Sequence, residues 1–132
     1  MSAALATPAN QKFAKAYEAK YAQVPSYYSE GTYVSGVALK AALEAIGGDI
    51  ENVDRFLGAL RKVDLSDAPR GPMRFDDYGN PIQNVYISRI QKIKHPVMGE
   101  VMVNVPIKTY PAVSQFWTWT PEEFMKMGPY KR

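Results

Sequence analysis

Residues 25–48 read PSYYSEGTYVSGVALKAALEAIGG, and the rest of the chain is organised around this stretch. Its second part, from Thr32 to Ile46, carries only two charged side chains, Lys40 and Glu44. A helix with so little charge has few faces that favour water, so we expect a helix that other elements cover on most sides. Gly47 offers the left-handed backbone conformation that commonly ends a helix.

The composition is that of a globular protein with one domain. The 132 residues are 46% apolar and 22% charged, which is enough for one core and too little for two full domains. The net charge is +3, but the basic residues are scattered among 13 acidic ones, so we expect no nucleic-acid partner. The absence of cysteine excludes disulfides and thiolate chemistry.

The apolar runs are too short to predict membrane insertion. The first residues lack the basic and apolar regions of a signal peptide. Either the mature chain is cytoplasmic or any export signal lies outside this sequence.

Two further helices are predicted on either side of the central one. Thr7 and Pro8 suit the N-cap and the first position of a helix, and Pro25 stops it. Asp49 or Asn52 caps the next helix. Aromatic residues at Phe13, Tyr17 and Tyr21 give the first helix a stripe, and Ile50, Val53, Phe56, Leu57, Leu60 and Val63 give the other helix one apolar face.

The pattern changes after Asp64. Residues 73–75 are predicted to be extended, and residues 76–81 form a turn rich in Asp, Gly and Asn. Two strands, Val85–Ile93 and Val101–Ile107, joined by a turn at Pro96–Gly99, predict a β-hairpin. The tail holds Trp117 and Trp119 in an extended segment, followed by a short helix that starts at the capping box Thr120-Pro-Glu-Glu. We therefore expect an α+β chain, helical over residues 7–63 and β-rich over residues 71–132.

The loop from Ser26 to Gly31 is the best candidate site. Tyr27, Tyr28, Ser29 and Glu30 place aromatic faces, a hydroxyl and a carboxylate side by side, and such a set can bind a small ligand. The alternative is that both tyrosines pack in the core and that Glu30 complements the helix dipole.

Catalytic and metal-binding motifs are scarce, so we expect no enzyme and no cofactor. The single histidine, His95, has no second histidine or cysteine with which to share a metal, and we expect it to be a surface turn residue. Turn chemistry accounts for Asp76, Asp77 and Asn80 without calcium.

A set of motifs spread over nearly the whole chain resembles a known family. The motifs are Phe13-x3-Tyr17-x3-Tyr21-x3-Pro25, Tyr28-x4-Tyr33, Gly71-Pro-Met-Arg-Phe-Asp76-x2-Gly79, Tyr86-Ile87 and Lys108-Thr-Tyr-Pro-Ala-Val-Ser-Gln-Phe-Trp117. In this order they are similar to the C-terminal part of periplasmic solute-binding proteins of ABC transporters. The most similar group is the branched-chain amino acid type, with relatives that take aromatic acids or amides.

The resemblance implies a two-lobed α/β fold of which this chain would be a fragment, a single partial domain. It also implies a periplasmic location, a small amino acid or aromatic acid as ligand, and an ABC permease as partner. Tyr28 would make the family's aromatic contact with the ligand, and Tyr27, Ser29 and Glu30 are its neighbours.

A full member of the family is more than twice as long as this chain, and the missing N-terminal portion carries the groups that hold the ligand carboxylate. We therefore expect a truncated binding protein that does not close on a ligand by itself. The helix from Thr32 to Ile46 would lose the sheet that it covers, so its apolar face predicts self-association, such as a homodimer. The alternative is a small self-associating interaction domain without a transport function.

Overall fold

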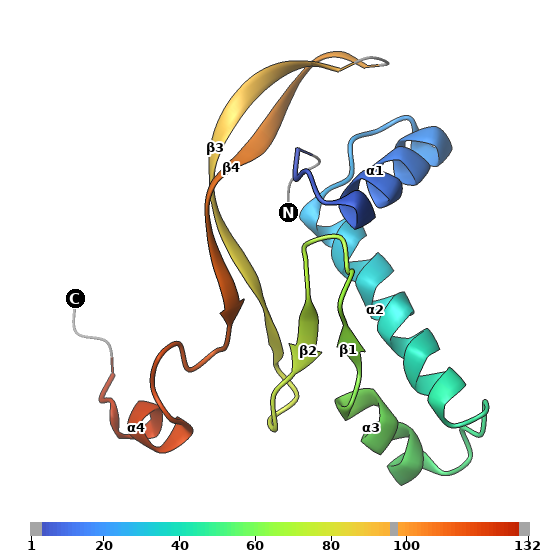
Figure 1. Ribbon diagram of the computed structural model, residues 1–132, viewed down its shortest axis with the longest axis vertical. Helices are drawn as coiled ribbons and strands as arrows, with labels where there is room; N and C mark the ends of the chain where they lie inside the picture. The colour runs from blue at the N-terminus through green and yellow to red at the C-terminus, as the bar shows by residue number, and fades with distance from the viewer. Residues whose placement is uncertain (1–3, 96–97, 130–132) are drawn as a thin grey trace.

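The computed structural model describes residues 4–95 and 98–129. In this part of the chain, four helices accompany one antiparallel sheet with the strand order β1-β2-β3-β4. The elements follow the order α1 (Pro8–Tyr21), α2 (Tyr27–Ala45), α3 (Val53–Arg61), β1 (Asp64–Leu65), β2 (Met73–Phe75), β3 (Pro81–His95), β4 (Gly99–Val113) and α4 (Pro121–Lys126). The long β3–β4 hairpin curves away from the short strands, and α2 and α3 flank those strands (Figure 1). The expected α+β order of three helices, hairpins and a short helix is confirmed.

The first helix forms as its sequence predicts. Thr7 is the N-cap and accepts a hydrogen bond from the backbone N–H of Asn10, with Pro8 at the first helical position. The aromatic stripe is present, since the Phe13 ring lies 5.9 Å from that of Tyr17. Phe13 also lies 4.9 Å from the ring of Tyr33. This last contact fixes α1 against α2.

The central helix begins five residues earlier than predicted. Ser26 is the N-cap of α2, and its hydroxyl accepts from the backbone N–H of Ser29 while the Ser29 hydroxyl accepts from that of Ser26. This capping box satisfies N–H groups that would otherwise lack partners, so the segment from Tyr27 to Gly31 is helical. The prediction of a loop at residues 26–31 is therefore wrong.

Only one face of α2 is covered within the described residues. Ala38 and Ala42 are buried against the sheet, whereas Tyr28 and Leu39 of the same helix are exposed. A Cβ placed on Gly36 would meet no described atom within 4 Å beyond its own helix and chain neighbours. The prediction that this helix is covered on most sides is wrong for the described chain.

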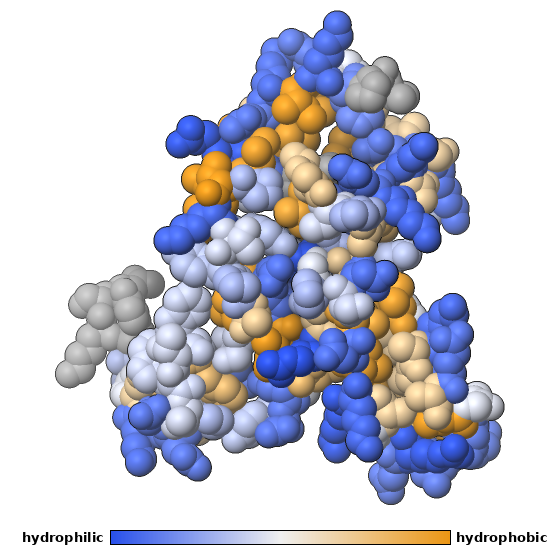
Figure 2. Space-filling view, viewed as in Figure 1, coloured by the Kyte–Doolittle hydropathy of each residue, from blue (hydrophilic) through white to orange (hydrophobic). Residues whose placement is uncertain are grey.

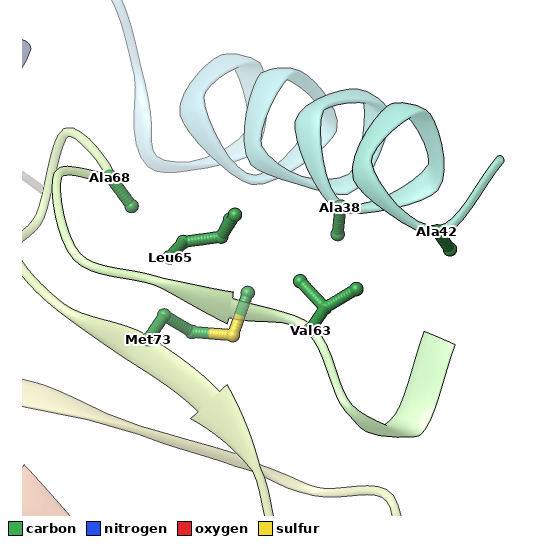
Figure 3. Close-up of a cluster of buried hydrophobic side chains, with 6 residues drawn as sticks. All are labelled: Ala38, Ala42, Val63, Leu65, Ala68 and Met73. Atoms are coloured by element: carbon green, nitrogen blue, oxygen red, sulfur yellow. The ribbon is translucent and has the colours of Figure 1, made fainter. Parts of the chain in front are cut away.

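The core lies between α2 and the two short strands. It consists of Ala38, Ala42, Val63, Leu65, Ala68 and Met73, which point toward one another (Figure 3). The alanines of α2 let β1 approach closely, and Phe56 and Leu60 of α3 pack at the edge of this cluster. Burying each larger side chain contributes roughly 1.5–3 kcal/mol. Strand β1 is absent from the sequence-based prediction. Three residues predicted on the apolar face of the third helix are exposed, namely Val53, Leu57 and Ile50, and Ile50 lies before the helix begins.

Of the two N-cap residues expected for the third helix, Asp49 and Asn52, the structure shows Asn52. Its side chain accepts a hydrogen bond from the backbone N–H of Arg55. The predicted turn at residues 76–81 is also confirmed. Asp76 Oδ1 accepts from the backbone N–H groups of Tyr78 and Asn80, as expected for an aspartate that stabilises its own turn.

The predicted hairpin is confirmed and is longer than expected. Its register runs from Gln83 opposite Val113 to His95 opposite Gly99, with two irregularities between Gln83 and Ser88. Pro96 and Val97 of the predicted turn lie outside the described residues. Figure 2 shows apolar surface over the hairpin, where Ile90 and Met102 are exposed. The edge strand β4 contains Pro106 and Pro111, and proline opposes pairing with a further strand because it has no N–H to donate.

The C-terminal segment differs from the prediction at its tryptophans. Residues 115–118 form a turn, and Trp117 has a positive φ of 57°, so the predicted extended segment from Trp117 to Trp119 is wrong. The Phe116 ring packs between those of Tyr78 and Phe124, which holds α4 close to the turn at residues 76–81. The predicted capping box is confirmed, and its hydrogen bond from the Thr120 backbone lowers the pKa of Glu123.

None of the helices among the described residues has the length and hydropathy needed to cross a membrane.

Replacing Gly71 by Ala should destabilise the fold. Gly71 has a φ of +101°, and an added Cβ would lie 2.6 Å from Nδ2 of Asn84. Strain and this clash together are expected to lower the free energy of unfolding by about 2–3 kcal/mol, measured by denaturant titration. Gly58→Ala, in the middle of α3, is the matched control. Its helical position has open space, so the free energy of unfolding should rise by roughly 0.5–1 kcal/mol. Equal effects of the two changes would contradict this account.

Candidate functional site

The four residues predicted as a site all lie in the first turn of α2, but they have different surroundings. Tyr28 is 82% exposed, and its ring meets the ring of Tyr27 edge to face at 5.9 Å. Tyr27 is also exposed, so neither tyrosine packs in the core. Both hydrogen-bonding groups of the Ser29 hydroxyl are used in the capping box with Ser26. Glu30 is 1% exposed and faces inward.

Glu30 forms a buried ion pair with Arg70, a residue that the sequence reasoning did not single out. Arg70 Nε donates to both carboxylate oxygens at 3.2 and 3.1 Å, and Arg70 Nη2 donates to Oε2. Such two-point contact is the strong form of a carboxylate–guanidinium interaction. The signal was present in the sequence, because a glutamate on an apolar helix face needs a cationic partner. What the sequence did not show was which cation it meets.

Two more side chains complete the surroundings of Arg70. The Tyr27 ring lies 4.6 Å from the guanidinium carbon, and Arg70 Nη1 donates to Gln83 Oε1 at 3.2 Å. Burial by itself would lower the pKa of Arg70, but hydrogen bonds to Glu30 and Tyr27 and the negative charge of Glu30 outweigh it and raise the pKa. Arg70 therefore stays charged and fixed beneath Tyr27.

The loop that carries Arg70 joins three elements. Thr7 of the α1 cap donates its hydroxyl to the Pro69 carbonyl at 3.0 Å. Tyr86 of β3 donates its hydroxyl to the Arg70 carbonyl, and the Asn84 amide donates to the Tyr86 hydroxyl. Residues 69–71 therefore contact the N-terminal ends of α1 and α2, and β3 at Tyr86.

A cavity of about 400 Å³ opens beside this junction, between the start of α2 and the hairpin. Tyr27 of α2 and Arg70 line one side, and Gln83, Tyr86 and Ser88 of β3 with Asn104 of β4 line the cavity from the hairpin. The volume lies in the range of small-molecule sites, and an aromatic face with a few convergent polar groups is their usual composition. No group of three or more His, Cys, Asp or Glu within residues 4–95 and 98–129 is placed to hold a metal. The arrangement suits binding of a small polar aromatic molecule.

The structure places His95 differently from the sequence-based prediction. His95 is the last residue of β3, and its side chain is 14% exposed instead of lying on a surface turn. Its Nε2 lies 3.2 Å from Glu18 Oε2, and its Nδ1 accepts from the Met98 backbone N–H. His95 therefore joins the end of the hairpin to α1.

Comparisons with known proteins give one family and several solved structures. Residues 1–94 match the family described as periplasmic binding protein. An ABC transporter substrate-binding protein from Sphaerobacter thermophilus is 26% identical, with a TM-score of 0.76 over 85% of this chain and 29% of that one. Comparison with curated proteins gives no match.

Three of the solved structures hold aromatic acids, and two of these are at least 26% identical to this chain. An ABC transporter solute-binding protein from Rhodopseudomonas palustris BisB5, in complex with 3,4-dihydroxybenzoic acid, is 28% identical with a TM-score of 0.77, over 86% of this chain and 30% of that one. A second one from R. palustris, in complex with benzoate, is 26% identical with a TM-score of 0.67, over 86% and 29%. The chain thus spans about 30% of the length of these proteins.

Replacing Arg70 by Met should be strongly destabilising, because it leaves the buried carboxylate of Glu30 without its partner. The free energy of unfolding is expected to fall by about 3–5 kcal/mol, and the double variant Glu30→Met/Arg70→Met should recover most of that loss. Arg55→Met is the matched control, since its ion pair with Asp49 is about half exposed and should cost less than about 1 kcal/mol. A loss below 1 kcal/mol for Arg70→Met would show that the pair does not constrain the fold.

Proposed function

Because this chain belongs to the periplasmic binding protein family, we propose that it serves as part of an ABC-transporter substrate-binding protein for a small aromatic acid. The chain spans about 30% of the solved proteins that it matches, so the ligand, the permease partner and the extracytoplasmic location all belong to this proposal. The family is one of binding proteins and not of enzymes. The alternative of an interaction domain without a transport function gains no support from the comparisons.

The main support for an aromatic acid as ligand is the combination of aromatic and polar side chains at the start of α2. Tyr27 stacks on the charge of Arg70 and lines the cavity, and the exposed ring of Tyr28 lies edge to face against Tyr27. Aromatic rings prefer such faces, and a carboxylate prefers a guanidinium. Two solved relatives with 26% and 28% identity are complexes with benzoate and 3,4-dihydroxybenzoic acid, which favours an aromatic acid over a branched-chain amino acid.

The four predicted site residues take different parts in this proposal. Tyr27 lines the cavity and contacts the ligand ring, and the exposed Tyr28 ring, edge to face with Tyr27, extends this contact outside the cavity. Ser29 fixes the helix start through its capping hydrogen bonds, and Glu30 holds Arg70 in place. Both act on the ligand only through their neighbours.

Benzoate and 3,4-dihydroxybenzoate should raise the melting temperature of the protein by several degrees at concentrations far above Kd, and leucine should not. A ligand that binds only the folded state stabilises it by about 2.7 kcal/mol at 100 times Kd. Tyr28→Ala should abolish the shift without lowering the melting temperature of the free protein, since Tyr28 is 82% exposed. Tyr78→Ala, which removes an exposed tyrosine elsewhere, should keep the shift. No shift with either acid would contradict the proposed ligand class.

We also propose that the open face of α2 mediates self-association. Thr32, Gly36, Leu39 and Leu43 recur along this face and include no charge, and Gly36 permits close approach of a second helix. Leaving such a face in water forgoes the free energy of apolar burial. A second copy of the same face is the partner that the chain itself supplies.

Sedimentation at micromolar concentration should therefore show a dimer. Leu39→Glu should shift the protein to a monomer, because a charge buried in a helix interface is strongly unfavourable. Met125→Glu is the control, since Met125 is exposed on α4, and it should leave the dimer intact. A sharp monomer peak for the unmodified protein would contradict self-association.

A further inference from the structure

The hairpin wall of the cavity carries two polar side chains that the fold itself does not use. Ser88 of β3 lies opposite Pro106, and Asn104 of β4 lies opposite Ile90. This register makes Ser88 and Asn104 diagonal neighbours on one face of the hairpin. Both line the cavity, and within the described residues no hydrogen bond of either side chain is found.

The neighbouring polar residues are, in contrast, engaged in the structure. The Asn84 carbonyl oxygen accepts from the Ala112 backbone N–H, and its amide donates to the Tyr86 hydroxyl. The Tyr86 hydroxyl in turn donates to the Arg70 carbonyl. These hydrogen bonds hold the wall in place, whereas the side chains of Ser88 and Asn104 make no such contact with the fold.

The opposite wall keeps a hydrogen-bond donor of its own. Glu30 engages the Nε–H and one N–H of Nη2 of Arg70, and Gln83 engages one N–H of Nη1. A guanidinium has five N–H groups, so at least one remains even when the hydrogen bond to Tyr27 is counted. That donor suits a carboxylate. Arg70 lines the cavity beside Tyr27, and Ser88 and Asn104 line it from the hairpin, so a guanidinium and an amide–hydroxyl pair border the same cavity.

We propose that Ser88 and Asn104 are specificity-determining residues that read a hydroxyl group on the ring of the bound aromatic acid. The inference rests on the proposed function and names its substrate more closely. The carboxylate lies at Arg70, the ring lies against Tyr27, and the ring hydroxyl exchanges hydrogen bonds with Asn104 and Ser88. A site that offers hydrogen-bonding groups to a hydroxyl discriminates against the analogue that lacks it. Because both side chains are exposed to water, the preference for the hydroxylated acid is about 5- to 10-fold and not larger.

Calorimetric titration of the 132-residue protein with benzoate, 3-hydroxybenzoate and 4-hydroxybenzoate tests this inference. At least one hydroxybenzoate should bind about 5- to 10-fold more tightly than benzoate. In Asn104→Ala and Ser88→Ala that preference should fall toward one, while the Kd for benzoate stays unchanged. Gln91→Ala is the matched control, because Gln91 is an exposed side chain of β3 that alternates to the face opposite Ser88 and Ile90.

The outcomes separate the inference from the proposed function. A preference that persists in both alanine variants, or a tighter binding of benzoate than of both hydroxybenzoates, overturns the role of Ser88 and Asn104 and leaves aromatic-acid binding standing. Absence of binding of all three acids at millimolar concentration overturns the proposed function together with the inference. The melting temperature of each free variant shows whether it is folded, and both replacements are at exposed positions where the fold should tolerate them.

Discussion

The buried ion pair between Glu30 and Arg70 is the constraint on which the rest of the structure depends. Taking a carboxylate out of water costs several kcal/mol unless a cation with good geometry replaces the lost hydration. Glu30 is fixed in the first turn of α2, so the loop that carries Arg70 has to lie against that turn. Tyr27 above the guanidinium, Gln83 at its end and Tyr86 on its carbonyl then follow from the same placement.

This placement connects the fold to binding. The pair draws the start of α2 toward the hairpin, and the cavity of about 400 Å³ lies where their side chains do not meet. The open face of α2 is a separate feature that points away from the sheet and carries no charge. One region of the chain thus offers a polar cavity suited to a small molecule, and another offers an apolar face suited to a second helix. Membership of the periplasmic binding protein family relates the cavity, and not the apolar face, to the binding of a small molecule.

Much of the fold was predictable from local sequence. Thr7, Asn52 and Thr120 each cap a helix, and Asp76 forms its turn, because these hydrogen bonds join residues only a few positions apart. The errors have local reasons too. The helix start at Ser26 was missed because its capping box uses Ser29 in place of the usual Glu or Gln. Strand β1, with two residues, is too short to show a periodic pattern and exists only through pairing with β2.

For the candidate site, too, some features follow from the sequence and others only from the tertiary structure. The sequence by itself determined the order of helices and hairpins, the cluster of Tyr27, Tyr28, Ser29 and Glu30, and the resemblance to solute-binding proteins. Tertiary structure alone decided that Glu30 turns inward to Arg70, 40 residues away, and that Ser88 and Asn104 line the same cavity as Arg70. The physical reason is that caps, turns and periodic faces depend on neighbours in the chain, whereas a charge pair and a cavity depend on which distant segments the packed core brings together.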